Sequence, residues 1–358
     1  MKIGILTFHW SNNYGAVIQA YALLSKLKEL GHEAYIIDRR MVYKGILRKL
    51  YHKFSYEHFF SWQKFWKDAD AFLQPRTKTY TSHDELVNNF DKEDFDAVIV
   101  GSDQVWRWKL IGLNYFFDFI TDNKTRRYSY AASFGLNEWR GTEEDRNAIS
   151  ELLKRFNRIS VREESGVKIC KETFGVDAEL VLDPTLLHTG EFYEQTLLKN
   201  HNRQRSGKVV SYILGKNNKK QVKEIAEWAK SINMKHDELL WTSIEHPSLI
   251  GKSEFHATHV TPIEWLNEIR NAEYIITNSF HATVFSILFQ KQFVVLTHEG
   301  GGNNRLETLF NTLGIKGRNT SDIASIDTIL SDEIDYDIVN KKLEESRMSS
   351  ETFLKSII

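Results

Sequence analysis

Several loops of this 358-residue chain place reactive side chains directly after strand-like runs. His281 precedes an apolar helical pattern at 282–289, and a helix N-terminus there would depress its pKa toward the range useful for acid–base catalysis. Asp103 follows the run 95–100 and could act as a general base or hydrogen-bond a sugar hydroxyl. The alternatives are a structural histidine and a helix-capping aspartate.

Arginines in two further loops could hold an anion. Arg162 follows the run 158–161, and a guanidinium suits bidentate binding of carboxylate or phosphate. A salt bridge to a neighbouring glutamate is the alternative. Arg305 lies in the first turn of the helical pattern 304–313, where a cation opposes the helix dipole, so a nearby anion would offset the cost. The glycines at 300–302 suggest an anion-cradling loop but lack the Lys-Ser/Thr of a P-loop.

Smaller polar groups occupy two of these loops. Asn13 and Tyr14 end the loop after the first strand, and Ser102 and Gln104 flank Asp103. Hydroxyl and amide groups just before a helix could hold a sugar, and helix capping is the alternative. The first loop lacks the Gly-x-Gly-x-x-Gly pattern, so a dinucleotide fingerprint is absent.

The elements that would position these residues form two strand–helix series. A strand, a helix and a second strand within the first 38 residues imply a parallel sheet. We predict an α/β chain with two Rossmann-like domains at 1–190 and 205–330, and a helical tail at 331–358. The first series has strands at 2–8, 33–38, 95–100, 127–133, 158–161 and 179–182, and a helix at 16–30. The second has strands at 208–214, 238–241, 274–278 and 293–297, and helices at 219–232, 262–271, 282–289 and 304–313.

Composition excludes several classes of protein. Lys plus Arg number 47 and Asp plus Glu 48, which argues against a strongly basic nucleic-acid binder. No apolar stretch of about 18 residues and no secretory signal pattern occurs, so we expect a soluble cytoplasmic protein. The single cysteine, Cys170, allows no internal disulfide, and no Cys-x-x-Cys pair suggests a metal site. A net charge of −1 would permit homo-oligomers.

One insertion, at 39–90, breaks the strand–helix pattern. Its first part, 39–67, holds eight Lys or Arg, one acid and nine aromatic residues. This combination suits peripheral contact with an anionic membrane or lipid headgroup, with Trp62, Phe65 and Trp66 on one helical face. The alternative is that the aromatic residues are buried and the lysines solvated.

Taken together, these loops resemble the polysaccharide pyruvyl transferase family. The resemblance covers most of the chain except 40–90 and the C-terminal tail. It implies a fold similar to the two-domain glycosyltransferase architecture called GT-B. The matching segments are FHWSNNYGAVIQAYAL (8–23), VGSDQVW (100–106), YAASFG (130–135), SVREESG (160–166), LDPTLL (182–187), ITNSFHATVFSILF (276–289) and NRLETLFNTLGIKGR (304–318).

The resemblance implies transfer of a pyruvyl group from phosphoenolpyruvate, a donor substrate and not a cofactor, onto two hydroxyls of a sugar. The product would be a cyclic ketal on a bacterial polysaccharide or its lipid-linked precursor, made at the inner membrane face. His281 and Arg162 match residues of the family's motifs. The implied roles are catalysis by His281 and Asp103; donor binding by Arg162, Arg305, Ser279 and Arg318; and acceptor binding by Asn13, Tyr14, Ser102 and Gln104.

The chain departs from the family pattern at two positions. Ser279 stands where better-studied relatives carry an arginine, so a second donor arginine must come from elsewhere, with Arg305 and Arg318 as candidates. The residue after His281, often glycine in the family, is Ala282. The departure leaves two alternatives: a GT-B glycosyltransferase that uses a nucleotide sugar, and a sugar-binding assembly protein with a degenerate site.

Overall fold

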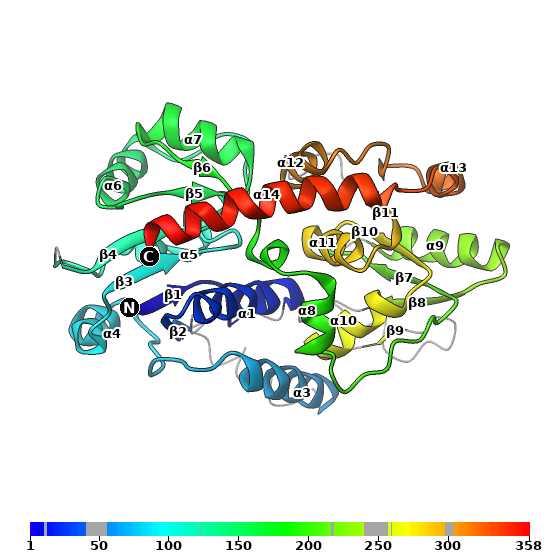
Figure 1. The fold of residues 1–358 in the computed structure, drawn as a ribbon, viewed down its shortest axis with the longest axis horizontal. Coiled ribbons are helices and arrows are strands. Elements are labelled where there is room, and N and C mark those ends of the chain that lie inside the picture. Colours follow the sequence, from blue (N-terminus) through cyan, green and yellow to red (C-terminus); the bar gives the residue numbers. More distant parts are fainter. Residues whose placement is uncertain are drawn as a thin grey trace.

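The chain folds around two parallel sheets in the computed structural model (Figure 1). The structure describes residues 1–10, 13–40, 56–122, 124–215, 218–239, 257–258, 260–297 and 304–358. The first sheet has the order β2-β1-β3-β4. Bridges from Tyr128 to Arg158 and from Ala132 to Val161 continue it toward a β5-β6 pair. Its strands are β1 (Lys2–Leu6), β2 (Glu33–Ile36), β3 (Ala97–Val100), β4 (Arg126–Ser129), β5 (Ser160–Val161) and β6 (Glu179–Leu180).

The second sheet has six parallel strands in the order β12-β11-β10-β7-β8-β9. Together the two sheets and their flanking helices form an α/β fold with two Rossmann-like domains, as predicted. The strands are β7 (Lys208–Tyr212), β8 (Lys235–Leu239), β9 (Ala257–Thr258), β10 (Tyr274–Thr277), β11 (Gln292–Leu296) and β12 (Asn319–Thr320).

N-cap side chains mark the starts of two helices that border the site. The Asn13 side chain accepts hydrogen bonds from the amides of Gly15 and Ala16 at the start of α1. Ser279 caps α11 through the amide of Ala282. The helices are α1 (Tyr14–Glu29), α3 (Tyr56–Phe72), α4 (His83–Asn89), α5 (Trp108–Ile111), α6 (Glu143–Leu153), α7 (Glu164–Phe174), α8 (Gly190–Gln195), α9 (Lys219–Ser231), α10 (Pro262–Asn271), α11 (Phe280–Leu288), α12 (Asn304–Leu313), α13 (Ile326–Ser331) and α14 (Tyr336–Ile357).

An aromatic cluster joins the two domains. The Tyr14 ring of α1 lies 5.5 Å from the Trp265 ring of α10 and 5.7 Å from the Tyr212 ring of β7, and all three side chains are buried. Burial of such large rings is a strong source of stability. The cluster therefore fixes the first turn of α1 against the second domain.

The described part of the insertion packs onto this cluster. Phe65 and Trp66 of α3 are almost fully buried, and Trp66 stacks on Trp10 with ring centroids 3.7 Å apart. Lys64 forms an ion pair of 2.5 Å with Glu264 of α10. Phe65 and Trp66 are therefore core residues, which corrects the expectation that they dip into a membrane. The side chain of Trp62 and the basic residues Lys49 and Lys53 lie outside the described residues.

The C-terminal helix α14 spans both domains (Figure 1). Its Ser350 hydroxyl accepts a hydrogen bond of 2.9 Å from the Leu182 amide, and Arg347 Nε donates to the Leu186 carbonyl at 2.9 Å. Glu351 pairs with Lys26 of α1 at 3.1 Å. The helix thus holds in place the segment 182–186, which follows β6.

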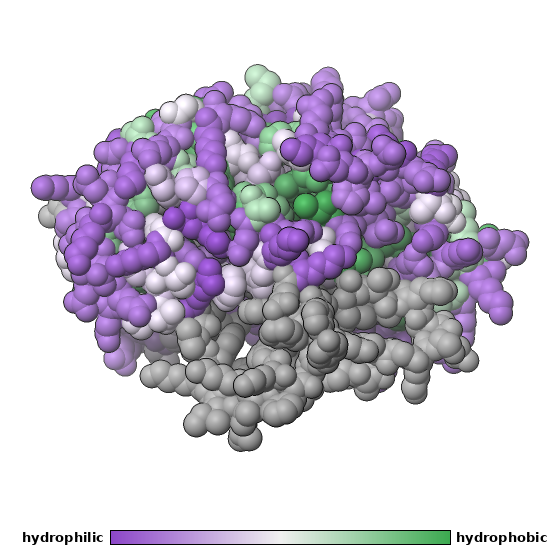
Figure 2. Space-filling model, turned by 90° about the horizontal axis from the view of Figure 1, so that it is seen from below, coloured by the Kyte–Doolittle hydropathy of each residue, from purple (hydrophilic) through white to green (hydrophobic). Residues whose placement is uncertain are grey.

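The described part of the face seen from below in Figure 2 is mainly hydrophilic, with a smaller apolar area near its middle. Among the described helices, none is both long and apolar enough to cross a membrane.

Candidate active site

The site forms where strands end in both domains, the usual position for ligands in open α/β sheets. From the first domain come Ser102 and Asp103 after β3 and Arg162 after β5. From the second come His281, in the first turn of α11 after β10, and Arg305, in the first turn of α12 after β11. The structure brings these predicted residues into one region between the domains.

Arg162 is the centre of a buried ionic network. Its side chain is fully buried, and Nη1 donates to Asp183 Oδ2 at 2.8 Å while Nη2 donates to Asp103 Oδ1 at 3.0 Å. Glu163 Oε2 lies 3.9 Å from Nε. Burial alone would lower the pKa of Arg162, but the charges of these three carboxylates outweigh it and raise the pKa. Arg162 is therefore a fixed cation that is already neutralised by the protein.

Asp183 connects this network to His281. Its Oδ2 lies 2.8 Å from the Ser102 hydroxyl and 3.7 Å from His281 Nε2, and its Oδ1 accepts from the Thr185 hydroxyl at 2.7 Å. Burial would raise the pKa of Asp183, but the interactions with His281 and Arg162 hold it well below its usual range. Asp183 is thus a carboxylate that faces His281 across an ion-pair distance.

His281 is buried where the two domains meet. Its Nε2 forms no hydrogen bond with any side chain or backbone group in the described part of the chain, because 3.7 Å to Asp183 is too long for one. A Cβ atom added to Gly15 would lie 2.2 Å from His281 Nδ1 and Cγ. The imidazole therefore rests directly on the first turn of α1, and its Nε2 is available to exchange a proton.

Arg305 differs from Arg162 in having no counterion. Among the described residues, none forms a hydrogen bond or an ion pair with its half-buried guanidinium. Burial and the nearby charge of Arg162 lower the pKa of Arg305 to about 10, against the opposing charges of Glu163 and Asp103. It remains a cation at neutral pH, and an anion in the cavity could accept hydrogen bonds from its N–H groups.

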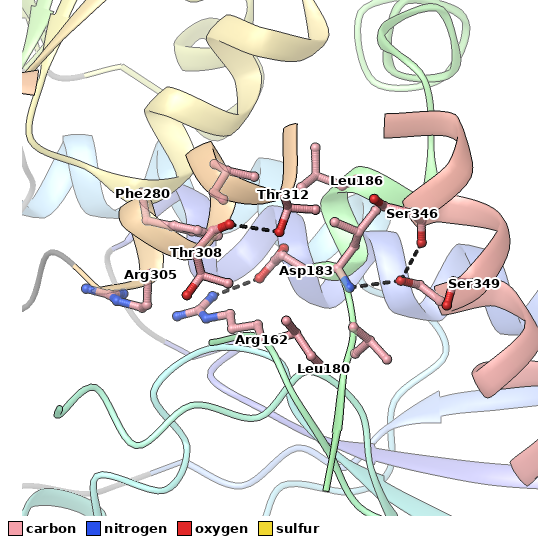
Figure 3. Close-up of a pocket in the computed structure, with 14 residues that line it drawn as sticks. Arg162, Leu180, Asp183, Leu186, Phe280, Arg305, Thr308, Thr312, Ser346 and Ser349 are labelled. Atoms are coloured by element: carbon pink, nitrogen blue, oxygen red, sulfur yellow. Dashed lines mark hydrogen bonds and ion pairs between the residues drawn. The ribbon is translucent and has the colours of Figure 1, made fainter. Parts of the chain in front are cut away.

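Both arginines line one cavity of about 220 Å³. They lie at one end, and Ser346 and Ser349 of α14 lie at the other (Figure 3). Leucine side chains and threonine hydroxyls form the walls between them; the full lining is Arg162, Leu180, Val181, Leu182, Asp183, Leu186, Phe280, Arg305, Thr308, Leu309, Thr312, Ser346, Ser349 and Ser350. The cavity can hold a small anion with its charge at the arginine end.

A sequence model of the polysaccharide pyruvyl transferase family matches residues 13–300, a span that includes Asp103, Arg162, Asp183 and His281. The chain belongs to this family. Membership makes it a transferase that acts in polysaccharide biosynthesis. No curated protein matches the sequence.

Solved structures show the same GT-B architecture for this pyruvyl transferase family member. The UDP-N-acetylglucosamine 2-epimerase of Rickettsia bellii aligns with a TM-score of 0.57 at 12% identity, covering 99% of this chain and 95% of that one. The Methanocaldococcus jannaschii UDP-GlcNAc 2-epimerase has a TM-score of 0.54 at 14% identity, covering 94% and 93%. The spinosyn rhamnosyltransferase SpnG has a TM-score of 0.53 at 10% identity, covering 100% and 99%. At these identities the likeness concerns the fold.

Several predicted binding residues of this transferase have structural partners instead. Tyr14 is wholly buried in the aromatic cluster, which places it away from any surface that an acceptor could reach. Asn13 and Ser279 cap α1 and α11. Arg318 does not line the cavity; its Nη1 donates to the Ile329 carbonyl at 3.0 Å, toward α13.

The first-domain loop after β3 is also engaged within the protein. Ser102 and Asp103 belong to the ionic network, whereas Gln104 accepts a hydrogen bond from Arg107 at 3.2 Å. Asp103 adopts a positive φ of 72°, an unusual backbone for a residue other than glycine. Its carboxylate thus orients Arg162 and is not a free base in this arrangement.

Three residues of the site carried no assigned role in the sequence predictions. Asp183 stands in the family-like segment LDPTLL, where an aspartate before a proline signals a helix start. Gly15 and Phe280 contact the reactive side chains through tertiary packing. Of these three residues, only Asp183 has a local sequence signal for a site, because it is an acid directly after a strand-like run.

In the part of the chain that the structure describes, no three His, Cys, Asp or Glu side chains are arranged to hold a metal ion.

Proposed function

We infer that this transferase moves the pyruvyl group of phosphoenolpyruvate onto two hydroxyls of a sugar, forming a cyclic ketal and releasing phosphate. The observation that carries the proposal is the uncompensated Arg305 beside Arg162 at one end of the cavity. Phosphoenolpyruvate carries a phosphate and a carboxylate, and charge-assisted hydrogen bonds to arginine suit both. We expect Arg305 to bind the donor most directly, because Arg162 is already held by Asp103 and Asp183.

In the reaction the two sugar hydroxyls lose one proton each; one proton is gained by the methylene carbon of the donor, and the other leaves with phosphate. Protonation creates an oxocarbenium-like centre; one hydroxyl oxygen adds to it, phosphate leaves, and the second hydroxyl closes the ketal. His281 is placed to carry a proton, because its Nε2 is free of a hydrogen bond within the described residues and faces the Asp183 carboxylate. Asp183 would stabilise the imidazolium form.

The acceptor is proposed as a sugar of a bacterial polysaccharide or of its lipid-linked precursor. The family match supports a polysaccharide substrate. Contact with the inner membrane face would follow from a lipid-linked acceptor, with the basic residues of 39–67 as the candidate surface.

Thermal stabilisation by the donor and donor-dependent phosphate release test this function. Arg305→Met should weaken phosphoenolpyruvate binding by about 1.5–3 kcal/mol, the usual contribution of a hydrogen bond to a charged group. Arg140→Met, at an arginine whose side chain is 70% exposed, is the matched control and should change nothing. Arg162→Ala is a poorer probe, since it would leave buried carboxylates without a counterion and destabilise the fold.

Two results would overturn the proposal. Stabilisation by a nucleotide sugar, with none by phosphoenolpyruvate, would favour a GT-B glycosyltransferase. Binding of a sugar without turnover of either donor would favour an assembly protein with a degenerate site.

A further inference from the structure

The ring of Phe280 contacts three charged or reactive side chains of the site. The guanidinium carbon of Arg162 lies 4.7 Å from the ring centroid, and that of Arg305 lies 5.9 Å from it. The imidazole of His281 meets the ring edge-on, at 5.3 Å and an interplanar angle of 82°. No other aromatic ring in the described part of the chain has two arginines within cation–π distance.

Two neighbouring guanidinium groups repel one another, and the repulsion is part of what lowers the pKa of Arg305. Arg162 is compensated by carboxylates, but Arg305 has no such partner among the described residues. A benzene ring carries partial negative charge on its face and attracts cations there without occupying their hydrogen-bond donors. It can therefore hold Arg305 beside Arg162 while leaving the N–H groups free for a ligand.

We propose that Phe280 is a positioning residue that holds Arg305 beside Arg162 through cation–π contacts, so that the N–H groups of Arg305 face a phosphate or carboxylate anion in the cavity. Phe280 is only 6% exposed and is the first residue of α11, which fixes its backbone. A carboxylate at this place would also hold Arg305, but it would compete with the anionic ligand for the N–H donors of Arg305. The ring avoids that competition.

The inference rests on the proposed function only for the identity of the anion. Its test therefore uses inorganic phosphate as the probe in full-length protein, with binding measured by calorimetry. One, two and three fluorine atoms placed on the Phe280 ring preserve its shape and withdraw charge from its face stepwise. We expect the phosphate dissociation constant to rise with each fluorine, by about two- to thirty-fold in total.

Fluorination of Phe285 in the same helix is the matched control. Phe285 is fully buried and contacts the rings of Tyr193 and Trp265 at 5.0 Å and 5.8 Å. The same fluorines there should leave phosphate affinity unchanged. Phe280→Leu should lose affinity as well, and Phe280→Trp should retain more of it than Phe280→Leu, because tryptophan has the most negative ring face.

Unchanged phosphate affinity across the fluorinated Phe280 variants would overturn the inference and leave Phe280 as a packing residue. An equal loss of phosphate affinity in the fluorinated Phe285 variants would do the same. Absence of any phosphate binding by the wild-type protein would also overturn it. If the wild-type protein bound phosphate with the expected trend but did not use phosphoenolpyruvate, the proposed function would fail and the role of Phe280 would stand.

Discussion

Substitution of Gly15 by alanine tests the position of His281 without touching the histidine. The added Cβ would lie 2.2 Å from two atoms of the imidazole and 2.4 Å from His281 Cβ. An ordinary van der Waals contact begins near 3.4 Å, so the ring must move by about 1 Å. A displacement of about 1 Å in a catalytic group can cost about a hundred-fold in rate. Alanine favours a helix over glycine by about 1 kcal/mol, so α1 itself has no local reason to unfold.

The assay is phosphate release from phosphoenolpyruvate in the presence of acceptor, with the melting temperature as a parallel measurement. We expect Gly15→Ala to lower turnover by about a hundred-fold. In a His281→Ala background the same substitution should cost nothing further, because residues that act through one another are not additive. An equal loss in both backgrounds would refute the reasoning, and so would full activity of the single variant.

Two further substitutions address the proton chemistry and the buried acid Glu238. His281→Ala should lower turnover by about 10²–10⁴ and leave the melting temperature intact, and unchanged turnover would remove His281 from the mechanism. Burial raises the pKa of Glu238 from 4.5 to about 7, so the folded state favours its protonated form. The stability that Glu238 contributes should be complete below pH 4.5 and fall by about 3 kcal/mol as the pH rises to about 7. Glu238→Gln should abolish that slope in urea unfolding, and an unaltered slope would contradict the assignment.

Most elements were predictable because their signals are local. The helices Pro262–Asn271 and Asn304–Leu313 have the predicted bounds, since each has apolar residues at helical spacing, and Thr261 with Pro262 marks the start of the first. The strand β8 begins earlier than predicted, at Lys235 instead of 238. Its first three residues, Lys235, His236 and Asp237, are polar, so a search for apolar runs does not detect them as part of a strand. Side-chain partners such as Lys208, which pairs with Asp237 at 2.5 Å, allow such a sequence inside a sheet.

The expectation that ligands bind where parallel strands end predicted much of the site. It selected Asp103 and Arg162 at the carboxyl ends of strands in the first sheet and His281 at the end of β10 in the second, and the packing of the two domains brings these ends together. It did not apply to Arg318, which precedes its strand β12 and extends toward α13. Contacts such as Gly15 against His281 depend on how the two domains pack, and no spacing in the chain encodes that.

The charges at the site explain how a chain with Ser279 could still hold an anion. Within the Arg162 network, three carboxylates surround one guanidinium, which leaves no surplus positive charge for a ligand. The Ser279 hydroxyl caps α11 and carries no charge, so this position supplies no cation for a ligand. Arg305 lies in the first turn of α12, which follows β11, the strand that pairs with β10 in the sheet, and it reaches the same cavity from there. An anion bound at that end would therefore depend on Arg305 more than on any other cation that lines the cavity.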